Sequence, residues 1–100
     1  MDNLKSNASS DVAAGVIERR REPRYPASGE VRLFFADPLP LEVKGRLLDL
    51  SQSGFRAAHG FPGFQTGQSL HFRHDNGQGT ARVMWNRILP EHIETGFLVL

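Results

Sequence analysis

Two groups of residues have the types and spacing needed to bind a small anionic ligand. The first is the segment 19–24, Arg-Arg-Arg-Glu-Pro-Arg, which holds four of the twelve cationic side chains in a chain with a net charge of only +1. The second is Asp49-x-Ser51-x-x-Gly54, a carboxylate and a hydroxyl followed by a glycine. Arginine grips phosphate through two parallel hydrogen bonds, and aspartate accepts hydrogen bonds from ligand N–H groups.

Two prolines predict that the arginine segment is extended and not helical. Pro23 and Pro26 each lack a backbone N–H, and each disfavours the α conformation in the residue before it. In a helix, Arg20 and Arg24 would stack one turn apart. In an extended chain their Cα atoms can separate by up to roughly 13–14 Å. Two guanidinium groups at that distance can hold opposite ends of one doubly charged ligand.

Length and composition indicate one small domain in a reducing compartment. A chain of 100 residues with 39% hydrophobic residues can bury a single core. It has no cysteine, so neither disulfides nor a thiolate metal site is expected. The start of the chain lacks the apolar core of a secretion signal, and no apolar run could span a bilayer. We therefore expect a cytoplasmic protein without a membrane partner, and the near-neutral charge argues against binding a nucleic-acid polymer.

Alternating apolar and polar residues predict an all-β domain that follows a flexible N-terminal arm over residues 1–17. The predicted strands cover residues 30–35, 41–50 with a bulge at Gly45, 55–59, 69–74, 78–87 and 93–100. Asn76-Gly77 is the strongest hairpin signal, since it suits the two central positions of a type I′ turn. Trp85 is expected on the core face of its strand. Six short antiparallel strands with Gly- and Pro-rich turns favour a barrel or a closed sandwich over residues 18–100.

The two motifs together resemble those of the PilZ domain, a bacterial signal-transduction module that binds the second messenger cyclic di-GMP. The family has an Arg-x-x-x-Arg loop before a barrel and then Asp/Asn-x-Ser-x-x-Gly. Here these motifs read RREPR and DLSQSG, with 24 residues (25–48) between them. The likeness extends over residues 18–100, including ARVMWNR and ETGFLVL near the end. It implies a six-stranded antiparallel PilZ-type β-barrel and a nucleotide-binding receptor that changes conformation and partner affinity when cyclic di-GMP binds.

The resemblance also assigns expected roles to the motif residues. Arg20 and Arg24 would bind phosphate and the guanine Hoogsteen edge. Asp49 would accept hydrogen bonds from guanine N1 and N2, donors that adenine does not present in the same pattern. Ser51 would contact the ligand or hold Asp49, and Gly54 would let the backbone approach a purine closely.

The two remaining arginines extend the expected site. Arg21 would add a contact, although a solvated surface charge is an equally simple reading. Arg19 would favour two stacked cyclic di-GMP molecules per chain, because such a pair brings four phosphates into the site and needs more positive charge. We expect a monomer with a protein partner that the sequence does not identify, and no cofactor besides the ligand.

Other functions have weaker support in the sequence. A PilZ-like interaction domain that does not bind the ligand and an oligonucleotide-binding barrel of the OB type are the alternatives. His71 and His74 would face opposite sides of a strand, so no metal site is expected. Asp49, Ser51 and His59 contain the residue types of a hydrolytic triad, but no nucleophile elbow is present. We therefore expect no enzymatic activity.

Overall fold

The described part of the chain consists of β-strands and loops. The computed structural model describes residues 22–36 and 39–100. Within these ranges there is no helix, and the strands are β2 (Tyr25–Pro26), β3 (Glu30–Phe35), β4 (Leu41–Leu50), β5 (Gly54–His59), β6 (Ser69–His74), β7 (Gly77–Ile88) and β8 (Ile93–Val99). The arm expected over residues 1–17 and the site residues Arg19, Arg20 and Arg21 lie outside the described residues, so these expectations remain predictions.

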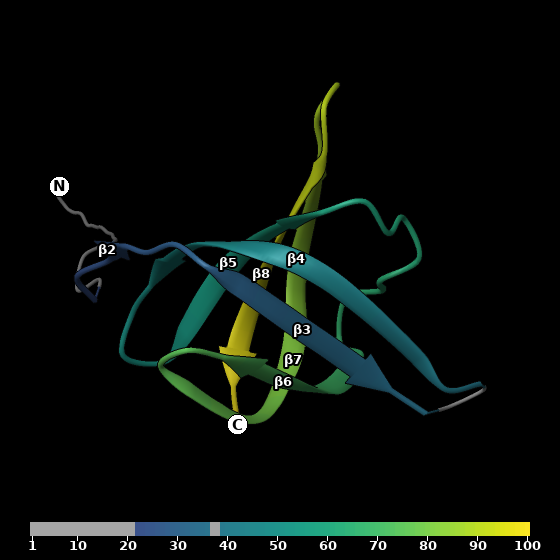
Figure 1. The fold of residues 1–100 in the computed structure, drawn as a ribbon, viewed down its shortest axis with the longest axis horizontal. Coiled ribbons are helices and arrows are strands. Elements are labelled where there is room, and N and C mark those ends of the chain that lie inside the picture. Colours follow the sequence, from purple (N-terminus) through teal and green to yellow (C-terminus); the bar gives the residue numbers. More distant parts are fainter. Residues whose placement is uncertain (1–21, 37–38) are drawn as a thin grey trace, which may run out of the picture.

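Six of the strands close into an antiparallel barrel (Figure 1). The order of hydrogen-bonded neighbours is β4-β3-β6-β7-β8-β5, and β5 pairs back onto β4. Closure of this kind leaves no free sheet edge among the six strands. The short strand β2 pairs with the end of β4, outside the closed ring. The prediction of a six-stranded antiparallel barrel is confirmed.

The core is apolar and rich in phenylalanine. The side chain of Phe55 lies at its centre, with its ring 4.8 Å from that of Phe97 and 4.9 Å from that of Phe72. Phe64 is buried, and Phe61 is partly buried against it, with 4.9 Å between the centres of the two rings. The buried cluster comprises Val31, Leu33, Val43, Leu47, Phe55, Ala57, Phe64, Leu70, Phe72, Ala81, Val83 and Phe97.

The hairpin between β6 and β7 forms one residue earlier than predicted. His74 pairs with Gly77, so the two loop residues are Asp75 and Asn76. Gly77 already belongs to β7, and the described glycines with a left-handed φ are Gly29 and Gly67. The hairpin itself is confirmed, but the assignment of Asn76-Gly77 to the central turn positions is wrong.

A β-bulge in β4 turns one side chain from the core to the outer face. Leu47 pairs with Ala57 of β5, whereas the next pair is Asp49 with Arg56, so Leu48 is the extra residue. Without the bulge, Leu47 and Asp49 would face the same side of the sheet. With it, Leu47 points into the core and Asp49 lies on the same face as Arg56.

A second bulge does the same in β7. Val83 pairs with Phe97 of β8 and Trp85 pairs with Gly96, so Met84 is the extra residue. Val83 is fully buried, but Trp85 is 41% exposed, and the expectation that Trp85 lies on the core face is wrong. The bulge reverses the alternation on which that expectation depended.

The bulge expected at Gly45 is absent. Gly45 pairs in register with Val31 of β3, and the register shift of β4 comes later in the strand. A Cβ at position 45 would lie 2.7 Å from the carbonyl oxygen of Ala58. Close approach of the β5 backbone therefore explains this glycine.

Candidate functional site

The Asp-x-Ser-x-x-Gly motif forms the end of β4, the following turn and the first residue of β5. The backbone N–H of Ser51 donates to the carbonyl oxygen of Gly54 over 2.9 Å, and the Ser51 hydroxyl donates to the same oxygen over 3.4 Å. The carbonyl oxygen of Ser53 accepts from the N–H of Val99, which ties the turn to β8. Ser51 lies in the turn and not on the strand, so its observed role is to shape the turn that follows Asp49.

Gly54 is required by the closure of the barrel. A Cβ at this position would lie 2.1 Å from the carbonyl oxygen of Phe97 on β8, and Gly54 is buried. The space that a side chain would need is therefore occupied by the neighbouring strand. This contact is sufficient to explain why position 54 is a glycine, whether or not a purine lies above it.

Asp49 is a buried carboxylate between two guanidinium groups. It is only 8% exposed. Its Oδ1 lies 3.0 Å from Nη2 of Arg24, and its Oδ2 lies 2.9 Å from Nη2 of Arg56. The Arg24 contact is a charge-assisted hydrogen bond, and the Arg56 contact is a close ion pair. The first of these contacts joins the two sequence motifs, because Arg24 is the last residue of the arginine segment.

The described part of the arginine segment lies against the turn of the second motif. Oε1 of Glu22 accepts hydrogen bonds from the backbone N–H of Ser53 over 3.1 Å and from its hydroxyl over 2.9 Å. These hydrogen bonds from Ser53 lower the pKa of Glu22 below its usual value. Tyr25 then pairs with Leu50, which continues the extended segment along β4. Residues 22–24 are thus attached and not helical, and Tyr25–Pro26 form a strand, which agrees with the effect expected of Pro23 and Pro26.

One row of paired residues crosses the outer face of four strands. Asp49 of β4 pairs with Arg56 of β5, Arg56 with Gly96 of β8, and Gly96 with Trp85 of β7. A Cβ on Gly96 would lie 2.3 Å from the indole, so the Trp85 ring covers this glycine. The two bulges place both ends of the row, Asp49 and Trp85, on the outer face.

The ion pairs continue from Arg56 to the tip of the β7–β8 hairpin, which extends beyond the barrel in Figure 1. Nη1 of Arg56 lies 3.4 Å from Oε1 of Glu94, whose side chain is only 13% exposed. Glu94 in turn lies 3.4 Å from Nε2 of His92 and 4.0 Å from Nη2 of Arg87. Asp49 and Glu94 are therefore bridged by one arginine.

Comparison with known proteins places this arrangement in a family. Residues 18–97 match the family of the PilZ domain. The chain belongs to the PilZ domain family. Its structure is similar to that of the Bacillus subtilis inhibitor of motility (MotI/DgrA), with a TM-score of 0.63 and 19% identity over 83% of this chain. It is also similar to the PilZ domain of YcgR from Escherichia coli, solved with c-di-GMP, with a TM-score of 0.61 and 21% identity over 83% of this chain.

This PilZ chain spans a different share of each of the two relatives. It covers 43% of the Bacillus subtilis protein and 79% of the Escherichia coli domain. At these identities the likeness shows the fold alone. No curated protein sequence matches the chain. The family match indicates no catalytic family.

Sequence reasoning gave no role to Arg56 in this PilZ domain. A signal was nevertheless present, because the turn predicted over residues 51–54 leaves Leu50 opposite Phe55 and therefore Asp49 opposite Arg56. The role of Glu22 was also missed. Its contact with Ser53 joins residues 31 positions apart, and local patterns do not report such a distance.

The two histidines considered as metal ligands lie on opposite faces of β6. His71 is exposed, whereas the ring of His74 lies 5.3 Å from that of Phe72, and burial lowers the pKa of His74. Among residues 22–36 and 39–100, no three His, Cys, Asp or Glu side chains are grouped to hold a metal ion. No helix within the same ranges is long and apolar enough to cross a membrane.

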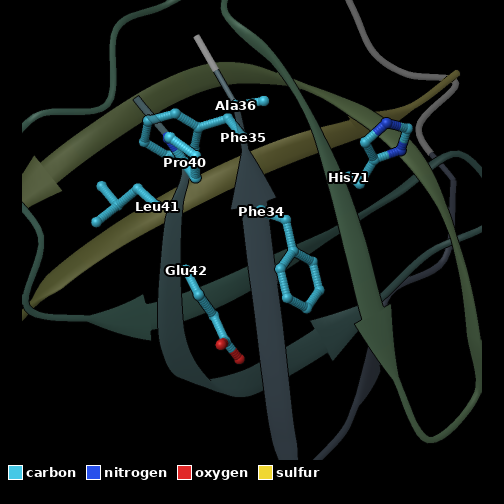
Figure 2. Close-up of a pocket in the computed structure, with 7 residues that line it drawn as sticks. All are labelled: Phe34, Phe35, Ala36, Pro40, Leu41, Glu42 and His71. Atoms are coloured by element: carbon cyan, nitrogen blue, oxygen red, sulfur yellow. The ribbon is translucent and has the colours of Figure 1, made fainter. Parts of the chain in front are cut away.

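A hollow lies at the end of β4 away from Asp49 (Figure 2). Its volume is about 390 Å³, and it is lined by Phe34, Phe35, Ala36, Pro40, Leu41, Glu42 and His71. Leu41 is eight residues from Asp49 along the strand, or roughly 26 Å at 3.3 Å per residue. The lining is apolar apart from one carboxylate and one imidazole. It thus lacks the guanidinium groups that a phosphate ligand needs.

Proposed function

We propose that this chain is a receptor for cyclic di-GMP that changes its conformation and its affinity for a protein partner when the ligand binds. The ligand would lie over the arginine segment 19–24 and the start of the β4–β5 turn. The proposal is supported by the family and by the solved PilZ domain of YcgR with c-di-GMP. Enzymatic activity is not part of it.

The ion pair between Arg24 and Asp49 carries the proposal, because it brings the two motifs into one place. Arginine can bind a phosphate or the O6 and N7 atoms of guanine through two hydrogen bonds. A carboxylate can accept from the N1 and N2 donors of guanine. Arg20 and Arg21 would extend the positive surface from the same segment. Together these groups match both the phosphates and the bases of cyclic di-GMP.

Ser51 and Gly54 would act in this site mainly through the turn. The hydrogen bonds from Ser51 to the Gly54 carbonyl fix the chain just after Asp49. The close packing of Gly54 against Phe97 fixes the start of β5. Both residues therefore help to set the position of the carboxylate relative to the ligand.

The conformational change would begin with Arg24. Its side chain is 47% exposed and pairs with a carboxylate that the guanine also needs. A ligand phosphate can attract this guanidinium and free Oδ1 of Asp49. The segment that precedes β2 would then move with Arg24. Such an exchange would change the surface that a protein partner meets.

The test is a calorimetric titration with cyclic di-GMP, cyclic di-AMP and a short single-stranded oligonucleotide. We expect cyclic di-GMP to bind tightly, cyclic di-AMP to bind much more weakly and the oligonucleotide not to bind. In Arg24→Ala the affinity for cyclic di-GMP should fall by about tenfold to hundredfold, because charged hydrogen bonds contribute about 1.5–3 kcal/mol. Arg32→Ala is the matched control, since this half-buried arginine also pairs with carboxylates but lies away from the site, on β3. No heat with cyclic di-GMP, with the fold intact, would favour the interaction domain that does not bind the ligand.

The same titration counts the ligands. Arg19 would hold a second stacked molecule of cyclic di-GMP, so we expect two ligands per chain and one in Arg19→Leu. A ratio of one in the parent would remove this role of Arg19 and leave the receptor proposal in place.

A further inference from the structure

Arg56 is held in place at both ends of its guanidinium group. Nη2 lies 2.9 Å from Oδ2 of Asp49, and Nη1 lies 3.4 Å from Oε1 of Glu94. Both carboxylates are largely buried, with side-chain exposures of 11% and 13%. The three residues belong to the neighbouring strands β4, β5 and β8, so the barrel itself fixes their separation.

The other guanidinium group on Asp49 is held less firmly. Arg24 makes one ion pair within the described residues, to Oδ1 of Asp49, and its side chain is 47% exposed. It also lies on the segment outside the closed barrel. An exposed arginine with one partner can exchange that partner at little cost. Of the two arginines on Asp49, Arg24 is therefore the exchangeable one and Arg56 the fixed one.

We propose that Arg56 is a positioning residue that sets the orientation of the Asp49 carboxylate and thereby the preference of the site for guanine over adenine. The inference rests on the proposed function and adds a determinant of base specificity to it. A carboxylate has about four acceptor positions on its two oxygens. Arg56 lies against Oδ2 as an ion pair, and the acceptor positions that face away from it are left for guanine donors once Arg24 has moved away from Oδ1.

Orientation matters because base reading depends on geometry and not on charge alone. Hydrogen bonds weaken steeply when donor and acceptor are misaligned. A carboxylate that is free to rotate would still attract cations, but it would discriminate poorly between guanine and adenine edges. The bulge at Leu48 places Asp49 opposite Arg56, and the arginine then fixes the carboxylate in one orientation.

The experiment measures the ratio of the affinities for cyclic di-GMP and cyclic di-AMP in the full chain. The variants are Arg56→Ala, Arg56→Lys and the control Arg32→Ala. Arg32 also bridges two carboxylates, Glu30 and Glu42, and its side-chain exposure of 36% matches the 35% of Arg56. Thermal unfolding of each variant shows whether the barrel is retained. Competition against cyclic di-GMP gives the weaker affinities.

We expect Arg56→Ala to lower both the affinity for cyclic di-GMP and the guanine preference by about tenfold. Arg56→Lys keeps the charge but not the planar fork. It should therefore recover part of the affinity without recovering the preference. In Arg32→Ala both quantities should stay within about twofold of the parent, as for most exposed ion pairs.

A double-mutant cycle with Asp49→Ala separates positioning from direct contact. If Arg56 acts through Asp49, the variant lacking both side chains should have the same base preference as Asp49→Ala alone. Additive losses of preference would overturn the inference, as would an unchanged preference in Arg56→Lys. A parent chain that binds neither dinucleotide would overturn the receptor proposal together with this inference, so the two failures are distinguishable.

Discussion

Strands β5 and β8 carry a polar network on each face, and the two networks differ in charge and in completeness. The inner network consists of His59, Thr95 and Asn86, and the outer network consists of Arg24, Asp49, Arg56 and Glu94. The inner network is formed by neutral groups that pair with one another or with the backbone. The outer network is formed by charges, and one of its donors, Nε of Arg56, is buried without a hydrogen-bond partner.

The inner network is a continuous chain of hydrogen bonds. The backbone N–H of Phe61 donates to Nδ1 of His59 over 3.0 Å, so the proton of the neutral ring lies on Nε2. Nε2 donates to the Thr95 hydroxyl over 2.6 Å, and this hydroxyl donates to Oδ1 of Asn86 over 2.6 Å. Asn86 then donates to the carbonyl oxygen of Phe64. Each donor thus has an acceptor, and the chain ties the loop after β5 to the barrel.

The difference between the networks shows where exchange can occur. His59 and Thr95 of the inner network are buried, so either group remains in a dry environment when it is left unpaired, and the network is therefore expensive to open. In a charged network, an exposed arginine can leave its carboxylate and pair with the phosphate of a ligand instead. We therefore expect changes in the inner network to affect stability, and changes in the outer network to affect binding.

Thr95→Val should have the largest effect on stability. Valine has the shape of threonine but leaves Nε2–H of His59 and Oδ1 of Asn86 without partners. The buried donor of His59 costs about 1–3 kcal/mol when it is unsatisfied, and the lost hydrogen bond to the exposed Asn86 adds about 1 kcal/mol, so we expect the free energy of unfolding to fall by about 2–4 kcal/mol in urea denaturation. The affinity for cyclic di-GMP should stay unchanged.

Thr80→Val is the matched control for this substitution. Thr80 also contacts a histidine on the neighbouring strand, with Oγ1 3.4 Å from Nδ1 of His71, but this pair is exposed. Its loss should cost less than about 0.5 kcal/mol. Equal losses in the two variants would mean that the inner network contributes no more than a surface contact.

The next largest effect on the free energy of unfolding should come from pH, through the titration of His59 in the inner network. Burial, with a smaller contribution from the charge of His92, lowers the pKa of His59 to about 4. The unfolded chain, with an ordinary pKa near 6.5, then binds more protons than the folded one between these values. The stabilisation is complete above pH 6.5 and is lost as the pH falls toward 4. Between pH 7 and 4.5 this amounts to about 2–3 kcal/mol.

Denaturant titrations of the parent and of His59→Gln across this range test the pH prediction. Glutamine does not titrate, so the difference in slope between the two proteins isolates His59 from His74, whose pKa is also lowered. Parallel slopes would contradict the prediction. A titration of the His59 ring signal by NMR gives the pKa directly.

The sequence was a good guide to strands and a poor guide to register. Alternation and turn residues predicted the strands at 30–35, 41–50 and 69–74 with the observed bounds. The bulges at Leu48 and Met84 were missed, because a bulge depends on the pairing of two strands and leaves no local signal. This is why Trp85 was expected in the core and why the bulge was expected at a glycine.

The candidate site was predicted only in part, because contacts between strands leave no local signal in the sequence. Residue types and the order of the motifs pointed to Arg24 and Asp49, which the structure brings within 3.0 Å. Ser51 was expected to contact the ligand or hold Asp49, and Gly54 to let a purine approach, and these ligand roles stay predictions. The structure adds that Gly54 packs against the backbone of β8 and that Ser51 closes its own turn. A motif identifies which residues lie together. Which of them contact the ligand and which hold the backbone in place depends on packing, which the motif does not show.

The smallest effect is expected at the contact between the arginine segment and the turn. Ser53 donates two hydrogen bonds to Glu22, which lies within the Arg-x-x-x-Arg motif. Ser53→Ala removes the hydroxyl donor and keeps the backbone one. Because an attached segment loses less conformational entropy when the ligand binds, we expect Ser53→Ala to weaken cyclic di-GMP binding by about threefold to tenfold. Stability should change little, since Glu22 lies outside the barrel.

Gln52→Ala provides the control, because Gln52 is the exposed neighbour in the same turn. Calorimetry of both variants should show the loss of affinity in Ser53→Ala alone, mainly in the binding entropy. An affinity in Ser53→Ala equal to that of the parent would show that the segment is held by Arg24 and β2 without help from Glu22. A gain in affinity would mean that the contact competes with the ligand, and the outer network would then contain two exchangeable members, Glu22 as well as Arg24.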